Sequence, residues 1–305
     1  MPETLRDLVA EELAHPVDAR VADMAAAIAQ RYGNASRAVL FYGSCLRTAE
    51  LQGQMLDFYL IVSDYREAYG RSWLAHANRL IPPNVFPFEH EGLAAKFAVL
   101  SEADFQRECG LSATSVSVWA RFAQPSRLVW FSDDSAAEHV IDSVANAAPT
   151  LFQFTLPMLR DEVDPFDIWK RGFALTYGAE LRSERRDRSS GIVEAWPERY
   201  RTFTDPTLAA VALEMGVGPE GQVSFISSPQ KMAKRWQRMQ RKGKALSVLR
   251  LAKASATFAG GIDYLAWKIN RHAGTNIVIK PWQRRWPLLG AVTLLPRLLK
   301  GGAIR

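Results

Sequence analysis

Short apolar runs alternate with polar turns through the first part of the chain. Runs at about 37–42, 56–63 and 95–100, and a shorter one at Val129-Trp130-Phe131, predict buried β-strands. Residues 65–80 and 102–109 have helical spacing, and the first of these helices is expected to stop before Pro82-Pro83. Strands that alternate with helices predict an α/β fold with a mixed sheet.

Helical periodicity dominates two other stretches. Residues 3–32 carry Ala, Leu, Val and Met at helical spacing, and the pattern is helical again from about 135 to 180. A basic, helix-compatible segment follows at 228–250. We therefore expect a sheet domain at 1–150, a mainly helical second domain at 151–245, and a basic, amphipathic C-terminal segment at 246–305.

The composition indicates a folded protein of a reducing compartment. With 305 residues, 48% of them hydrophobic, the chain can bury real cores. Cys45 and Cys109 have neither metal-ligand spacing nor a disulfide framework, and Cys45 is expected to be a small buried residue. The N-terminus does not resemble an export signal, and no apolar segment reaches transmembrane length. We expect a cytoplasmic protein that is peripheral on the cytosolic face of a membrane.

Charge is distributed unevenly along the chain. Residues 231–305 contain 17 Lys and Arg and a single acid, Asp263, whereas the first 230 residues contain 21 basic and 31 acidic residues. A concentration of positive charge predicts affinity for phosphates, whether on lipid headgroups, nucleic acid or nucleotides.

A Gly-Ser pair between two predicted strands is the strongest chemical signal. Gly43-Ser44 follows the first strand, and Asp57 opens the next one. A glycine turn lets backbone N–H groups approach triphosphate oxygens, and a carboxylate on the neighbouring strand can hold Mg²⁺ against them. The pair alone would be an ordinary turn, but a carboxylate at the start of an apolar strand is costly unless it is paired or metal-bound. This arrangement is the skeleton of a nucleotidyltransferase site.

Several short motifs occur in a fixed order along the chain. They are Tyr42-Gly43-Ser44, Met55-Leu56-Asp57-Phe58, Asn78, Lys96-Phe97-Ala98-Val99, Arg121 with Gln124-Pro125, and Tyr177-Gly178-Ala179-Glu180-Leu181-Arg182. In this order they resemble the mitochondrial translocator assembly and maintenance family over roughly residues 35 to 280, which would make the chain a bacterial member. Members of that family are phosphatidate cytidylyltransferases, which join CTP and phosphatidic acid to give CDP-diacylglycerol and pyrophosphate in phospholipid synthesis.

The resemblance implies a fold, a cofactor and partners. The fold would be a DNA polymerase β-like nucleotidyltransferase sheet with a second, helical domain that could be winged-helix-like. The cofactor would be Mg²⁺, and the partners CTP, phosphatidic acid and an anionic membrane surface, with no nucleic acid expected. Asp57, Lys96 and Arg121 would be catalytic, and the nucleotide would contact Tyr42, Gly43, Ser44 and Asn78. Asp57 and Asp64 would bind the metal, although Asp64 could equally be a turn-forming residue at a strand end.

The chain departs from the family pattern at several positions. Tyr59 stands where many nucleotidyltransferases carry a second carboxylate, Gln124 stands for a Lys, and Ala75 stands for a His. Two further segments match the family less closely, at Glu180 with Arg182 and around Lys253. These departures bear on nucleotide or lipid selectivity more than on the type of reaction.

The C-terminal tail has the composition of an interfacial anchor. Between 282 and 300, apolar residues are bracketed by Trp and Arg, and prolines disfavour the alternative of a long helix packed on the protein's own core. Two other functions remain open: a nucleotidyltransferase that acts on a soluble alcohol or on RNA, and an inactive nucleotidyltransferase fold that binds an anionic membrane or nucleic acid.

Overall fold

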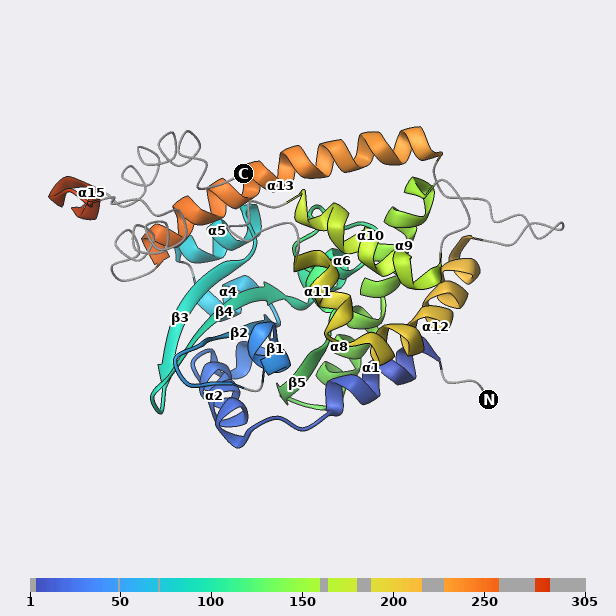
Figure 1. Cartoon of the computed structure of the whole chain (residues 1–305). Coiled ribbons are helices and arrows are strands. Elements are labelled where there is room, and N and C mark those ends of the chain that lie inside the picture. The colour runs from blue at the N-terminus through green and yellow to red at the C-terminus, as the bar shows by residue number, and fades with distance from the viewer. Residues whose placement is uncertain are drawn as a thin grey trace.

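The computed structural model describes residues 4–48, 50–70, 72–159, 164–179, 188–215, 228–257 and 278–285. Its centre is a five-stranded sheet in the order β3-β4-β2-β1-β5 (Figure 1). The strands are β1 (Ser36–Tyr42), β2 (Met55–Val62), β3 (Asn84–His90), β4 (Leu93–Ser101) and β5 (Ser126–Phe131). β2 and β4 run parallel, and the other neighbouring pairs run antiparallel. The expected mixed α/β sheet is therefore present.

The two faces of the sheet follow from the alternation of side chains along each strand. Leu56, Phe58 and Leu60 of β2 point to one face, where they join a core with four helices. These helices are α2 (Ala19–Gln30), α3 (Ser44–Thr48), α4 (Tyr65–Tyr69) and α5 (Trp73–Leu80). Asp57, Tyr59 and Ile61 occupy the alternate positions and face the opposite layer.

Helices from both ends of the chain form that opposite layer. They are α1 (Leu5–Ala14), α6 (Glu102–Cys109), α7 (Trp119–Phe122), α8 (Asp134–Ala145), α9 (Ala147–Thr155), α10 (Pro165–Tyr177), α11 (Arg188–Glu194), α12 (Pro197–Met215) and α13 (Pro229–Thr257). Two 3₁₀ turns, η1 (Gly33–Ala35) and η2 (Leu156–Met158), and a short helix, α15 (Pro281–Arg285), complete the described elements. In Figure 1, α13 lies along one edge of this layer.

The helical region and the sheet share one hydrophobic core. The expected boundaries at 150 and 245 both fall inside helices, α9 and α13. One cluster joins Tyr59 of the sheet to Phe152 of α9 and Trp236 of α13. After Phe131 the described residues form helices only. None of the described helices combines the length and apolar composition needed to cross a bilayer.

Two elements differ from the sequence-based expectation. The helix expected at 65–80 is two helices, because Gly70 ends α4 at a φ of +62°. Strand β3 was not expected, since Pro82, Pro83 and Pro87 argue against a strand. β3 tolerates Pro87 because it is an edge strand that pairs only with β4.

A buried ion pair ties the N-terminal helix to the helical region. Nε of Arg199 in α12 donates to Oε2 of Glu12 in α1 at 2.6 Å, and each side chain is 10% exposed. Nη1 of Arg199 also donates to the carbonyl of Ala123 at 2.9 Å. The ion pair therefore joins α1 to α12, and the hydrogen bond to Ala123 attaches α12 to the residue that follows α7.

We predict that Glu12→Gln lowers the free energy of unfolding by about 3 kcal/mol, because the guanidinium of Arg199 stays buried without its anion. Urea unfolding would measure the loss. Glu198→Gln is the matched control, since Glu198 pairs with Arg201 at the exposed surface of α12. The control should change the free energy by less than about 1 kcal/mol. Equal effects of the two substitutions would contradict the structural role of Glu12.

Candidate functional site

One row of side chains crosses the sheet beside the Gly43 turn. β1 ends where β2, β4 and β5 begin. Tyr42 of β1 is paired with Ser126 of β5 and with Asp57 of β2, and Asp57 is paired with Lys96 of β4. Because residues directly opposite each other share a face of the sheet, these four side chains lie in line across four strands.

Asp57 is held by the lysine of the neighbouring strand. Nζ of Lys96 lies 2.9 Å from Oδ1 of Asp57, and the two side chains are 37% and 18% exposed, respectively. A carboxylate that is mostly removed from water needs a cation or hydrogen-bond donors to remain charged. Lys96 supplies that cation and is itself exposed enough to meet a ligand.

Gly43 brings the turn close to the same carboxylate. Its φ is +98°, and a Cβ at this position would lie 3.0 Å from Oδ2 of Asp57. Both the conformation and the close approach require glycine. Ser44 then begins α3 with an exposed side chain. The turn that approaches Asp57 is therefore followed directly by an exposed serine.

Arg121 reaches the row through Tyr42. Burial raises the pKa of Tyr42 well above its ordinary value, the charge of Asp57 acts in the same direction, and the adjacent Arg121 opposes the shift. Arg121 also donates to the carbonyl of Ser117. At neutral pH the site therefore combines a protonated phenol, two cations and one carboxylate, a set that suits phosphate oxygens.

Cys45 lies beside the site but is not an activated nucleophile. Its side chain is buried, and burial together with the charge of Asp57 raises the pKa of its thiol. A raised pKa keeps the thiol protonated and unreactive. The expectation of a small buried cysteine is confirmed.

The structure does not bring Asp64 to Asp57, which corrects the expected pair of metal ligands. Asp64 follows the far end of β2 and caps α4, where it accepts a hydrogen bond from the backbone N of Arg66 at 2.6 Å. Seven residues of extended chain place it about 20 Å from Asp57. The two carboxylates therefore cannot share an ion. Asp64 was expected to be either a metal ligand or a turn-forming residue at a strand end. The structure shows a residue at a strand end that caps a helix.

Asn78 is also placed away from the row. Its side chain is fully buried, donates to the carbonyl of Val99 at 2.9 Å, and accepts from the backbone N of Asn84. Both ends of the amide are therefore used to hold α5 against β3 and β4. These contacts correct the expected role of Asn78 in nucleotide binding, because its polar atoms already have partners inside the protein.

Other sequence candidates are engaged elsewhere. Gln124 donates to the carbonyl of Ala120 at 2.7 Å, and Tyr59 is buried against Tyr42 and Phe122. Two further carboxylates, those of Glu102 and Asp104, follow the far end of β4, as Asp64 follows that of β2. Glu180 and Arg182 lie outside the described residues.

Ser126 is a site residue that the sequence did not reveal. It is fully buried at the end of the row, and its hydroxyl has no hydrogen-bond partner among the described residues. Its position opposite Tyr42 depends on the pairing of β1 with β5. No local signal in the sequence reports that pairing.

The donor set limits how a metal can bind here. Among the described residues, no group of three or more His, Cys, Asp or Glu side chains converges. Mg²⁺ in nucleotide sites is commonly held by one or two carboxylates together with phosphates and water. The site therefore fits a Mg²⁺ ion that arrives on a nucleotide, with Asp57 as its protein carboxylate, and does not fit a resident ion.

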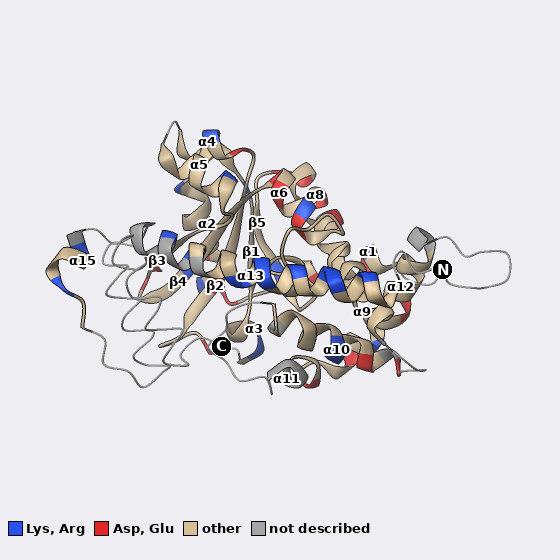
Figure 2. Ribbon diagram, turned by 90° about the horizontal axis from the view of Figure 1, so that it is seen from above, with Lys and Arg blue, Asp and Glu red and all other residues tan. Residues whose placement is uncertain are grey.

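The cations of α13 divide into two sets. Three of them face the protein: Arg235 donates to the carbonyl of Leu111, Arg250 to that of Pro82, and Lys253 to those of Ile81 and Pro83. Burial, with Arg250 nearby, lowers the pKa of Lys253 to about 7. The exposed set is Lys231, Lys234, Arg238, Arg241, Lys242 and Lys244; the first five share one side of the helix, and we call them the α13 stripe. Figure 2 shows these basic positions along the helix.

The α13 stripe is presented on a firmly held helix. Met232, Trp236 and Met239 lie in the core on the other side, and Nε1 of Trp236 donates to the carbonyl of Phe154 at 2.8 Å. Positions 231, 234, 238, 241 and 242 share one side of an α-helix because they are spaced by three, four or eleven residues. No acidic residue occurs in α13.

Comparisons with known proteins add a structural likeness. No family model and no curated protein matches the chain. A solved structure, that of a nucleotidyltransferase-like protein from Exiguobacterium sibiricum 255-15, is similar at 12% sequence identity, with 93% of each chain covered and a TM-score of 0.29. A likeness at this TM-score carries no conclusion about activity.

We predict that Gly43→Ala destabilises the protein more than Gly53→Ala. Both glycines have positive φ, but a Cβ at Gly53 meets nothing within 4 Å, whereas one at Gly43 meets Asp57. Backbone strain alone is worth roughly 1–3 kcal/mol, and the contact with Asp57 should add to it. Urea unfolding of the two variants would measure the difference. Equal losses would show that the Gly43 turn does not press on Asp57.

Proposed function

We propose that the chain is a nucleotidyltransferase that transfers the cytidylyl group of CTP to phosphatidic acid. The observation that carries the proposal is the row Tyr42–Asp57–Lys96 beside the Gly43-Ser44 turn. Cations, an exposed hydroxyl and one carboxylate meet there at one end of the sheet. The choice of CTP and phosphatidic acid over other substrates rests on the ordered motifs of the sequence.

In this reaction a phosphate oxygen of phosphatidic acid attacks the α-phosphorus of CTP. The bond from that phosphorus to the bridging oxygen breaks, and pyrophosphate leaves with the electron pair. The nucleophile is already ionised near neutral pH, so the site needs no strong general base. A site with a single carboxylate and several cations is chemically sufficient for this step.

The residues of the row have distinct tasks in the proposed reaction. Ser44 and the backbone of the Gly43 turn bind phosphate oxygens, while Lys96 and Arg121 neutralise the charge that grows on the departing pyrophosphate. Lys96 also orients Asp57 through their ion pair. Asp57 would hold a Mg²⁺ ion that enters with the nucleotide, and the ion would supply further neutralisation of the triphosphate.

Partners and location are proposed from the distribution of charge. An anionic membrane would bring the lipid substrate to a peripheral enzyme on its cytosolic face. The α13 stripe supports such a contact. Of the tail that the sequence marks as an interfacial anchor, only residues 282–285 lie among the described residues, and Trp282 there is exposed.

A second function is favoured by one specific observation. Asp57 is paired with Lys96, and Tyr59 fills the place where a second carboxylate would stand. An inactive nucleotidyltransferase fold that binds anions would have this composition. A transferase that acts on a soluble alcohol would share the row but would have no use for the α13 stripe, whereas one that acts on RNA would bind RNA phosphates with it.

We predict that the purified protein with Mg²⁺ and CTP labelled at the α-phosphate forms labelled CDP-diacylglycerol from phosphatidic acid. Asp57→Asn and Lys96→Met should each lower turnover by a factor of roughly 10² or more, because each removes charge that acts on the phosphates. Asp64→Asn is the control, since asparagine also caps helices well and Asp64 lies far from the row. Its turnover should stay within a few-fold of the wild type.

Each alternative has its own signature in this assay. Labelled nucleotide that binds without turnover would support the inactive binding module. Transfer to a soluble alcohol or to RNA, with none to phosphatidic acid, would overturn the lipid substrate. Loss of transfer in Asp64→Asn would contradict the placement of the site at Asp57.

We also predict that the triple variant Lys234→Gln, Arg238→Gln, Lys242→Gln binds anionic vesicles more weakly than the wild type. Each cation near such a surface contributes about 1 kcal/mol, so the partition coefficient should fall on the order of 100-fold at low salt. Vesicle flotation would measure it. A control triple with the same charge change, Arg20→Gln, Arg31→Gln, Arg201→Gln, should retain most binding. Equal losses of vesicle binding in the two triple variants would show that binding depends on net charge and not on the α13 stripe.

A further inference from the structure

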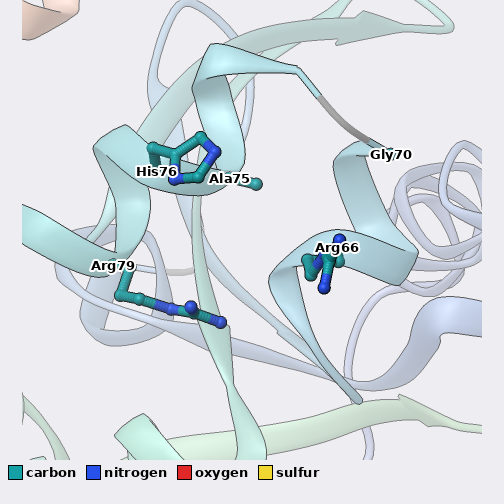
Figure 3. Close-up of a pocket in the computed structure, with 5 residues that line it drawn as sticks. All are labelled: Arg66, Gly70, Ala75, His76 and Arg79. Atoms are coloured by element: carbon teal, nitrogen blue, oxygen red, sulfur yellow. The ribbon is translucent and has the colours of Figure 1, made fainter.

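A basic pocket lies at the opposite end of β2 from Asp57. It has a volume of about 350 Å³ and is lined by Arg66 and Gly70 at α4 and by Ala75, His76 and Arg79 of α5. Figure 3 shows the Arg79 side chain extending from α5 toward the side of the pocket that carries Arg66. Two guanidinium groups from different helices therefore border one hollow.

The positive charge of this pocket is incompletely balanced. Oδ2 of Asp64 lies 3.9 Å from Nη2 of Arg79, which is too long for a hydrogen bond. The other oxygen of Asp64 is used by the backbone of α4. Within the described part of the chain, no acidic side chain pairs with the Arg66 guanidinium. Two cations face one carboxylate, so an anion with several oxygens can be accommodated.

Exposed apolar side chains stand next to the pocket. Trp73 is 53% exposed and Leu80 is 78% exposed. Together with His76 they have the spacing i, i+3 and i+7, so all three lie on one side of α5. The binding of a free phosphate would gain nothing from exposed Trp and Leu side chains next to the site. A membrane surface uses both features, because aromatic and aliphatic groups enter the interface while arginines bind headgroups.

We propose that this pocket binds the phosphate of an anionic phospholipid, with Arg66 and Arg79 as its cations and with Trp73 and Leu80 inserted into the interface. The lipid bound here is not the substrate, because the pocket lies about 20 Å along β2 from Asp57. The pocket would instead fix which face of the protein meets the membrane. This inference goes beyond the proposed activity and does not depend on it.

A fluorescent label at position 80 tests the proposal directly. Both native cysteines are buried, so Leu80→Cys can be labelled selectively with an environment-sensitive dye. With vesicles of phosphatidylcholine and phosphatidylglycerol, the label should shift to the blue and brighten. The matched control is Phe131→Cys, because Phe131 is also an exposed large apolar residue but ends β5 on the other edge of the sheet. Its label should remain in water.

The cations are tested in the same labelled protein. Arg66→Gln with Arg79→Gln should abolish the spectral shift at position 80 and weaken binding to anionic vesicles about 10-fold or more. Arg20→Gln with Arg201→Gln removes the same charge from ion-paired surface sites and should preserve the shift. Glycerol phosphate in solution should not displace the protein from vesicles, because it offers no interface for Trp73 and Leu80.

Three results would overturn the proposal. The first is a label at position 80 that stays in water while the protein floats with vesicles. The second is an unchanged shift in the Arg66, Arg79 double variant. The third is displacement by glycerol phosphate, which would indicate a site for a soluble phosphate. Failure of cytidylyl transfer would leave all three readouts unaffected, so the two proposals are tested separately.

Discussion

The ion pair between Asp57 and Lys96 is the interaction on which the arrangement of the site depends. β2 and β4 are parallel neighbours, and their register places these two residues side by side. A carboxylate at the start of an apolar strand would otherwise be costly to bury. The pair therefore explains why a charged residue is tolerated where the sheet enters its core.

The same pair sets the electrostatic character of the site. The carboxylate of Asp57 pairs with Lys96 and acts on the protonated hydroxyl of Tyr42, which Arg121 adjoins. A site of this composition favours a ligand that brings negative charge with it. A resident cation would have to compete with Lys96 for Asp57, whereas a triphosphate can draw on both cations and carry its own metal.

The basic C-terminal part of the chain serves two purposes. Arg250 donates to Oγ of Ser117 at 2.7 Å, and the carbonyl of Ser117 accepts from Arg121 of the site. The inward cations of α13 thus hold the helix on the segment that positions Arg121. The outward cations of the α13 stripe leave their charge in solvent. The number of basic residues in a segment therefore does not by itself tell how many of them are available to a partner.

Elements that depend on local chemistry could be predicted from the sequence. The apolar runs predicted four of the five strands, and Gly43 with Asp57 marked the site, because a glycine turn and a charged strand end leave a local signature. The distance of Asp64 from Asp57 follows from the length of extended chain between them. Asn78 and Ser126, in contrast, depended on distant pairing, and the pairing of β1 with β5 brings Ser126 to Tyr42. Contacts with β3 and β4 turn Asn78 inward. The positions of Asn78 and Ser126 required the folded structure, because strand register joins residues whose separation along the chain carries no information about their distance in space.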